Sequence, residues 1–201
     1  YVRGYPYLDR VSVRIVPDPA TRVAALRTGQ VHMTARGFST LSPREMELVK
    51  ASVSNMQFYP AQTPLGPAFT MNARRPPFSD VRVRKAVSLA LDRQAAVKIV
   101  ADGQGQAGTL LFLKGWGVPL EEILTWPGWR QPKDQDIAAA QKLMTEAGYP
   151  NGFDLELMSR TNQITLTSAT FVAGQLRTLG IRAQVKPLED ALFYNPQYQR
   201  G

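Results

Sequence analysis

A glycine-rich string is the motif in this sequence that comes nearest to a known chemistry. Residues Gly103 to Gly108 match the pattern G-x-G-x-x-G of dinucleotide-binding folds. In those folds a strand precedes the string and a helix follows it, so that backbone N–H groups meet a pyrophosphate at the helix N-terminus. Here a helical pattern precedes the string, and Gly117 and Pro119 interrupt the residues after it. We therefore interpret it as a connector, and an oxidoreductase that binds a nicotinamide or flavin stays one alternative.

Catalytic side chains do not form a recognisable set. The chain has no cysteine and a single histidine, His32, which lies in a predicted short strand and is interpreted as structural. Two carboxylate pairs, Asp134 with Asp136 and Glu121 with Glu122, fall at a helix start or in a loop. Capping and solvation explain carboxylates at such places. We expect no enzyme activity, no metal site and no cofactor.

Tryptophan is the residue type that favours a binding site instead. All three tryptophans lie in the segment 103–132, which is rich in glycine and proline and has little periodicity. A long segment of this kind in a compact domain is often functional, and tryptophan suits a concave ligand site. We predict Trp116 as a ligand-binding residue, with a small structural core as the alternative. Trp126 and Trp129 are interpreted as structural.

Composition and charge limit the classes of protein. The chain has 201 residues, of which 44% are hydrophobic and 20% charged, as in ordinary globular proteins. No apolar stretch approaches the roughly 20 residues of a membrane-spanning helix. The net charge of +8 leaves a basic nucleic-acid-associated α/β protein as the second hypothesis. We favour a solvated helix face for the densest basic group, which prolines and an aspartate interrupt: Arg74, Arg75, Arg82, Arg84 and Lys85.

The first sixty residues show alternating apolar patterns and two helix starts. Period-two alternation and β-prone composition predict strands over 10–16, 31–35 and 55–59. Asp18 followed by Pro19 predicts a helix that ends before Gly29. The spacing of Ser42 and Glu45 is that of a capping box, which predicts a helix to about Lys50. A strand, a helix and a second strand in this order favour an α/β sheet.

A proline-rich joint over 60–67 then marks a candidate boundary between a unit 1–60 and a unit 61–201. In the second unit, capping aspartates and apolar spacing predict three helices, which begin after Asp80, Asp92 and Asp134. A strand over 68–72, a strand over 153–158, a helix over 166–179 and a strand over 181–185 complete the pattern. The fold class expected from this order is α/β.

Several of these stretches together resemble the family 5 extracellular solute-binding proteins, the peptide-binding components of ABC importers. The most specific match is the run from Pro77 to Ala86, followed by Leu91-Asp92-Arg93. The other matches are Pro6 to Asp9, Asp18 to Val31, Gly103-Gln104-Gly105, Ala138 to Phe153, and Leu179-Gly180-Ile181. The resemblance runs from Tyr5 to about Lys186. His32 departs from it, because relatives have an acidic residue there.

The resemblance implies a fragment of a two-lobed periplasmic-binding-protein (clamshell) fold, type II-like with mixed sheets. Residues 1–60 would form part of lobe I, and 61–201 would form lobe II, incomplete at its C-terminal end. The implied protein binds a peptide or similar small solute outside the membrane, in the periplasm or extracellularly, and delivers it to the permease subunits of an ABC importer. Its contact with the membrane would be indirect, through the permease or a lipid anchor, and it would not bind nucleic acid.

The resemblance also implies where a ligand binds. In dipeptide-binding relatives, the loop that follows the strand matching 153–158 faces the cleft and can carry an arginine for the ligand carboxylate. Arg160 stands in this predicted loop, with Thr161 and Asn162 as hydrogen-bonding neighbours. These three residues and Trp116 are the predicted ligand-binding set. An arginine that faces solvent is the alternative for Arg160.

Overall fold

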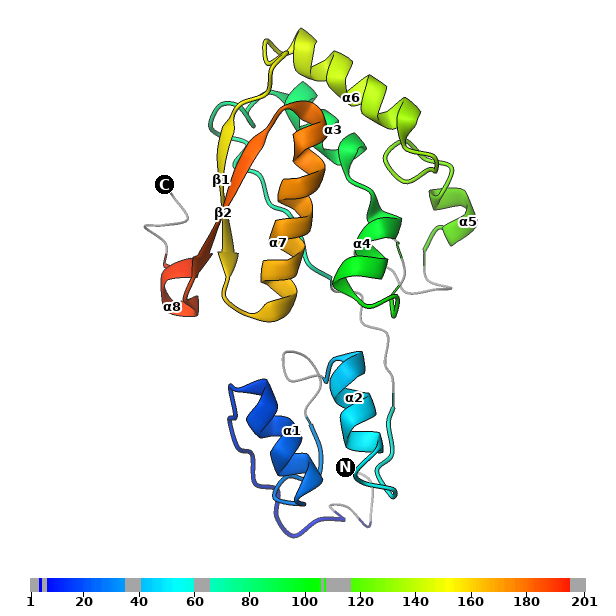
Figure 1. Ribbon diagram of the computed structural model, residues 1–201, viewed down its shortest axis with the longest axis vertical. Helices are drawn as coiled ribbons and strands as arrows, with labels where there is room; N and C mark the ends of the chain where they lie inside the picture. Colours follow the sequence, from blue (N-terminus) through cyan, green and yellow to red (C-terminus); the bar gives the residue numbers. More distant parts are fainter. Residues whose placement is uncertain are drawn as a thin grey trace. The chain divides into compact units, whose positions relative to one another are not determined.

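The chain packs as two compact units, Tyr1–Pro60 and Ala61–Gly201 (Figure 1). The computed structural model describes residues 4, 7–34, 41–59, 66–105, 107 and 117–195. The assignment of the two units to lobes I and II stays a prediction. Within the described residues, no helix has the length and apolar character needed to cross a bilayer.

Two helices make up the regular structure described in the first unit. They are α1 (Pro19–Arg27) and α2 (Pro43–Lys50), and both begin where their capping residues predict. The Ser42 N–H donates to Glu45 Oε2 at 2.6 Å, and the Glu45 N–H donates to Ser42 Oγ at 3.3 Å, so the capping box is complete. The helices bury an apolar cluster formed by Val23, Leu26 and Val49.

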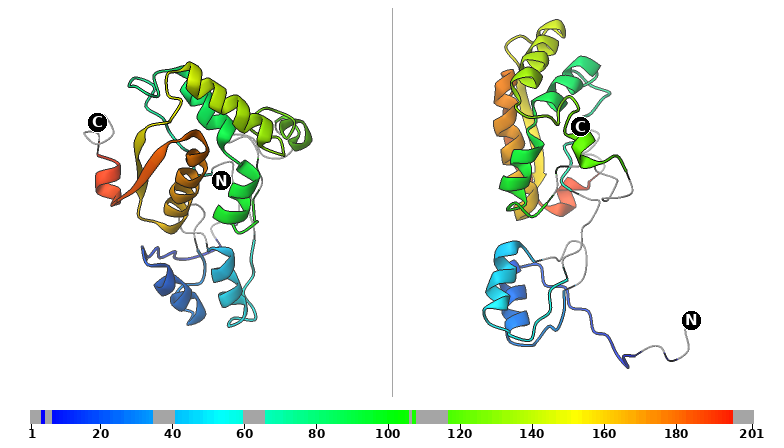
Figure 2. Two further views of the ribbon diagram at one scale, coloured as in Figure 1. Left: turned by 45° about the horizontal axis from the view of Figure 1, so that its top comes forward. Right: turned by 90° about the vertical axis from the view of Figure 1, so that its right-hand side faces the viewer.

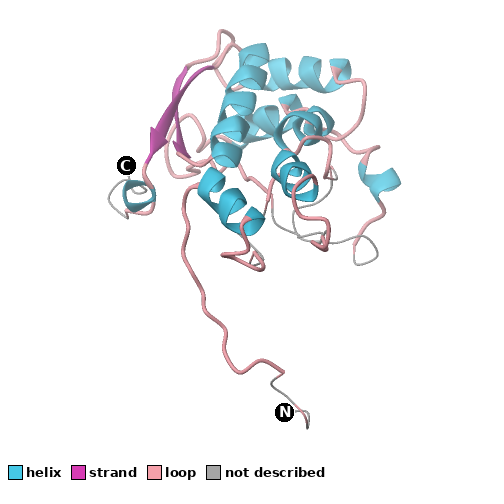
Figure 3. Ribbon diagram, turned by 60° about the horizontal axis from the view of Figure 1, so that its bottom comes forward, coloured by secondary structure: helices cyan, strands magenta, loops and turns pink. Residues whose placement is uncertain are grey.

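The strands predicted in the first unit are not formed. The described residues of 10–16, 31–35 and 55–59 form no hydrogen-bonded ladder, and Figure 3 draws them as loop. Val11, Val13 and Ile15 are 69%, 83% and 90% exposed. Alternation predicts which face of a strand is apolar, but a strand also needs a partner for its N–H and C=O groups. The described part of this unit supplies none, and residues 68–72 of the second unit, also predicted as a strand, do not form one.

The second unit contains the rest of the regular structure. Its strands are β1 (Asp154–Arg160) and β2 (Arg182–Leu188). Its helices are α3 (Val81–Ala90), α4 (Arg93–Val100), α5 (Leu120–Ile123), α6 (Asp134–Glu146), α7 (Gln163–Leu176), the short 3₁₀ helix η1 (Arg177–Leu179) and α8 (Asp190–Phe193).

Aspartate caps start α3 and α4 as predicted. Asp80 accepts from the N–H of Arg82 at 2.8 Å, and Asp92 accepts from the N–H groups of Gln94 and Ala95 at 3.0 and 2.9 Å. These bonds satisfy donors that the first turn of a helix leaves unpaired.

The cap predicted for α6 is wrong. Lys133 occupies the N-cap position without a side-chain capping bond, and Asp134 is the first helical residue. Asp134 is exposed there, so its charge favours the helix through the dipole rather than through a cap.

The described strands form a two-stranded parallel sheet, with α7 and η1 as the crossover between them. The register pairs Asp154 with Arg182 at one end and Arg160 with Leu188 at the other. Gly152 and Gly180, with φ of +70° and +72°, lie backbone to backbone where the strands begin. A Cβ on Gly152 would lie 2.1 Å from the Gly180 carbonyl, so only glycine fits this contact.

The core of the second unit lies between α3, α6, α7 and the sheet. Figure 2 gives two further views, in which α6 packs on α3 and α7 packs on β1 and β2. The buried residues of this core are Phe78, Val83, Ala86, Val87, Ala90, Ala140, Met144, Leu176, Leu179 and Ile181. The parallel sheet, with α7 packed on both of its strands, confirms the α/β class predicted from the sequence.

Candidate functional site

The carboxyl end of the parallel sheet carries the predicted arginine. Arg160 is the last residue of β1 rather than a residue of the following loop, so the predicted end of the strand at Met158 is wrong by two residues. The apolar alternation stops earlier, because Ser159 and Arg160 are polar, whereas the pairing with β2 continues to Leu188. Register therefore sets the end of this strand. Ligands of open α/β sheets bind outside the carboxyl ends of the strands.

The Arg160 guanidinium forms a two-point ion pair with Asp190 of α8. Arg160 Nε donates to Asp190 Oδ1 at 2.6 Å, and Arg160 Nη2 donates to Asp190 Oδ2 at 2.5 Å. The guanidinium carbon also lies 5.4 Å from the centre of the Tyr194 ring, within the range of a cation–π contact. This is the geometry in which arginine recognises a carboxylate, here provided by the protein itself.

The Arg160–Asp190 pair also shifts the pKa values of both of its side chains. Hydrogen bonding to Asp190 raises the pKa of Arg160, although partial burial opposes the change. Hydrogen bonds from Arg160 lower the pKa of Asp190, again against a smaller effect of burial. Both groups are therefore ionised at neutral pH.

The two neighbours of Arg160 have different environments. Asn162 is the N-cap of α7, and its Oδ1 accepts from the Thr165 N–H at 3.1 Å. The Thr165 hydroxyl donates to the Arg160 carbonyl at 3.1 Å, which ties the start of α7 to the end of β1. Thr161 is exposed between them. The structure thus brings Arg160, Thr161 and Asn162 together, and Asn162 has a capping role that the sequence analysis did not assign.

The structure describes two of the three tryptophans. Trp116 lies outside the described residues, so its predicted role stays a prediction. Trp129 packs against the Arg93 guanidinium, whose carbon lies 4.3 Å from a ring centre, and this is the structural role expected for it. Trp126 is partly exposed.

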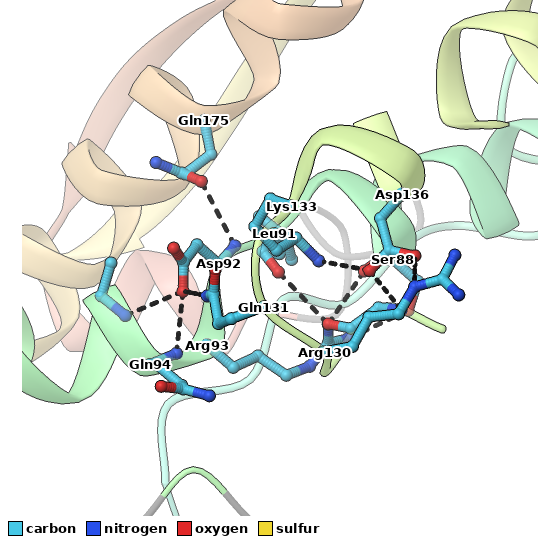
Figure 4. Close-up of polar contacts among 12 residues, drawn as sticks. Ser88, Leu91, Asp92, Arg93, Gln94, Arg130, Gln131, Lys133, Asp136 and Gln175 are labelled. Atoms are coloured by element: carbon cyan, nitrogen blue, oxygen red, sulfur yellow. Dashed lines mark hydrogen bonds and ion pairs between the residues drawn. The ribbon is translucent and has the colours of Figure 1, made fainter. Parts of the chain in front are cut away.

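A second polar group, which we call the Asp136 cluster, comprises Asp136, Gly128, Arg130 and Lys133, and Figure 4 shows its three side chains. Asp136 Oδ2 accepts from Lys133 Nζ at 2.9 Å and from the Gly128 N–H at 2.8 Å. Its Oδ1 accepts from Arg130 Nε at 2.9 Å. Burial by itself raises the pKa of Asp136, but bonds from Lys133, Gly128 and Arg130 outweigh it and hold the pKa below its ordinary value.

The interpretation of Asp136 as a solvated carboxylate is therefore wrong. Its side chain is 0% exposed, and it shares one face of α6 with Ala140 and Met144, four and eight residues further on. That spacing is the signal that could have predicted its burial. With all its bonds made inside the protein, the cluster is structural.

Asp92 and Arg93, which belong to the family-like run Leu91-Asp92-Arg93, also bind the segment 128–133. Arg93 Nη1 donates to the carbonyls of Gly128 and Ser88 at 2.6 and 2.9 Å. Asp92 accepts from Gln131 Nε2 at 2.8 Å, so residues 128–133 are fastened to the start of α4 (Figure 4).

The glycine string has the opposite context from a dinucleotide-binding motif. Gly103, with φ +75°, follows the C-terminus of α4, and its N–H donates to the Val97 carbonyl at 3.0 Å. The residues Gln106 and Gly108 lie outside the described part of the chain. The described half of the string thus ends a helix and does not begin one.

Part of the densest basic group is used within the fold. Arg82 pairs with Asp80 and donates to the Glu146 carbonyl at 2.7 Å. Arg84 donates to the Phe78 carbonyl at 2.7 Å. These contacts reduce the support for a nucleic-acid-binding stripe.

Comparison with known proteins identifies the class. The model for "Bacterial extracellular solute-binding proteins, family 5 Middle" matches residues 1–201. The glutathione-binding protein GsiB of Salmonella choleraesuis is 31% identical over 188 residues, which are 93% of this chain and 34% of that protein. GsiB of Escherichia coli strain K12 is 31% identical over 187 residues, again 34% of its length.

Solved structures agree on the fold. The periplasmic binding protein DppA of Helicobacter pylori, in complex with a peptide, has a TM-score of 0.62 at 22% identity, over 90% of this chain and 33% of that one. Haemophilus influenzae OppA in complex with a peptide has a TM-score of 0.59 at 26% identity, over 86% of this chain and 34% of that one.

The fold is thus that of part of a periplasmic binding protein of the clamshell type. The chain belongs to the bacterial extracellular solute-binding proteins of family 5, and it spans about a third of the length of the curated relatives that it matches. This membership places it with solute-binding proteins, not with enzymes, and it does not favour the nucleic-acid alternative.

Proposed function

We propose that this chain is part of a substrate-binding component of an ABC importer, and that it binds a peptide or similar small solute outside the membrane. Its contribution to the site is the carboxyl end of the β1–β2 sheet, where Arg160 supplies a charged group for a ligand carboxylate. The observation that supports the proposal is the two-point Arg160–Asp190 pair, in which the guanidinium holds a carboxylate of the protein itself.

The relatives support the class of ligand. Those named above are described as glutathione-binding or as complexes with peptides, and both kinds of ligand carry free carboxylates. In this proposal the permease subunits recognise the liganded receptor, residues 1–60 belong to lobe I and 61–201 to lobe II. A lipid anchor is one way in which the full-length protein would stay at the membrane. Thr161, Asn162 and Trp116 complete the proposed ligand-binding set.

The test is calorimetry on the full-length protein with glutathione and trialanine as probes. Replacing Arg160 with alanine should weaken binding by at most about 1.5–3 kcal/mol, the range for a hydrogen bond to a charged group, because a ligand carboxylate replaces the Asp190 pair. Arg177→Ala is the matched control, because this arginine is exposed at the opposite end of α7. Equal affinities for wild type and Arg160→Ala would remove the arginine from the site. Absence of binding to either probe, with no small solute found by native mass spectrometry, would refute the proposed function.

A further inference from the structure

The position that a ligand carboxylate would take on Arg160 is filled by the side chain of Asp190. The carboxylate faces the guanidinium edge formed by Nε and Nη2, with one oxygen on each nitrogen at 2.6 and 2.5 Å. Two parallel N–H to O bonds are also the preferred arrangement for a bound carboxylate anion. A ligand that uses this edge must therefore remove Asp190 from it.

We propose that Asp190 is an internal stand-in for the ligand carboxylate, so that binding exchanges one carboxylate for another on Arg160. The inference rests on the proposed function. It makes Asp190 a specificity-determining residue, since an anionic ligand group can replace it as the carboxylate on Nε and Nη2 of Arg160. A neutral amide at the same position cannot, and it is rejected.

The two partners differ in how readily they can move. The Arg160 side chain is 19% exposed, and its residue is held in the β1–β2 ladder. The Asp190 side chain is 57% exposed and belongs to α8, a helix of four residues with no buried residue and no side-chain cap. Elements with few buried contacts open at low cost. Asp190 can therefore turn into water while Arg160 stays in place.

Neighbouring charges on this face of the sheet are already matched. Glu156 accepts from Lys186 Nζ at 3.1 Å, and Asp154 accepts from Arg182 Nε at 2.6 Å. Neither carboxylate can replace Asp190 on Arg160 without breaking its own pair. The exchange is thus between Asp190 and a group from outside these pairs.

The experiment compares trialanine with trialanine amide on the full-length protein by calorimetry. Asp190→Asn should bind trialanine about two- to fivefold more tightly than wild type, the range expected when an exposed ion pair no longer competes. Binding of the amide should stay within twofold. Glu189→Gln is the matched control, because it removes a negative charge from the adjacent exposed residue, which precedes α8 without a side-chain capping bond. It should leave both affinities within twofold.

Three results would overturn the inference: weaker trialanine binding by Asp190→Asn, equal tightening of the amide, or the same effect in Glu189→Gln. Each of these leaves the proposed function standing, since the protein still binds a peptide. A second measurement does not depend on peptide binding. Acetate should raise the thermal midpoint of Asp190→Ala above that in equal chloride, and it should not do so in the Arg160→Ala, Asp190→Ala double variant. No difference between acetate and chloride would also overturn the inference.

Discussion

Replacing Asp136 with asparagine tests the role of the Asp136 cluster most directly. The substitution keeps the shape of the side chain and removes its charge. It also places an NH₂ group where one oxygen accepted hydrogen bonds, so that a donor then faces either Arg130 or the pair formed by Lys133 and the Gly128 N–H.

The expected cost follows from how deeply each partner is buried. Removing one member of a buried ion pair costs about 3–5 kcal/mol, because the remaining charge is left uncompensated. Arg130 is 34% exposed and can turn to water, whereas Lys133 is 9% exposed and cannot. We therefore expect the lower end, about 3 kcal/mol. This corresponds to a fall of roughly 6–12 °C in the thermal midpoint for a unit of this size.

The assay is urea and thermal unfolding of the 201-residue chain, followed by tryptophan fluorescence. Trp129 packs on Arg93 beside the cluster, so its emission reports on the same segment. Asp134→Asn is the matched control: it removes a carboxylate two residues away that is exposed, and it should cost about 0.5 kcal/mol through the helix dipole. Equal losses of stability in both variants would show that the cluster does not hold residues 128–133.

The pH dependence gives an independent check on the same carboxylate. The pKa of Asp136 in the folded protein is lowered from its ordinary value of 3.8, so its stabilising effect is present above that value. The effect is lost as the pH falls through the lower pKa of the folded state. The difference in stability between wild type and Asp136→Asn should stay constant above about pH 5 and shrink below about pH 4.

Three further substitutions test the local structure. Gly152→Ala should lower the free energy of unfolding in urea by about 3 kcal/mol or more, because its Cβ would meet the Gly180 carbonyl at 2.1 Å. Gly174→Ala, which has open space around it in α7, should instead raise the free energy of unfolding by about 0.5–1 kcal/mol. The reverse order would contradict the close contact of the two backbones. Asn162→Ala should cost about 1 kcal/mol by loss of the α7 cap and Asn162→Asp almost nothing, and equal losses would argue against capping. Ser42→Ala should cost about 1 kcal/mol and lower the hydrogen-exchange protection of α2, and unchanged protection would contradict its capping role.

The helices could be predicted because their starts depend on a few adjacent residues. Asp18, Ser42, Asp80 and Asp92 each bond to backbone N–H groups two or three positions ahead, so the whole interaction is written in a short stretch of chain. The two parallel strands could also be predicted from the sequence, because alternation and a glycine at each strand start are local signals.

The burial of Asp136, the end of β1 and the partner of Arg160 could not be predicted in this way. Each of them depends on residues far away in the sequence or on the register in which the strands pair. Asp134 and Asp136 are the same residue type in one helical turn, yet one is exposed and the other buried, because the segment that reaches Asp136 is anchored by Arg93 some forty residues earlier. Arg160 ends a strand because the β2 ladder extends to Leu188. Its engagement by Asp190, thirty residues further along the chain, has no local sequence signal.

The extended stretch before α1 affects how this chain behaves in concentrated solution. From Val11 to Val16 it is β-prone and free of proline, and the side chains of Val11, Val13 and Ile15 are exposed. Such a segment is a template for cross-β stacking with other copies. Arg14 places a positive charge near its centre and so acts as a gatekeeper against aggregation. A neutral residue at that position would make the polypeptide form fibrils or amorphous precipitate more readily, with no change in the folded parts.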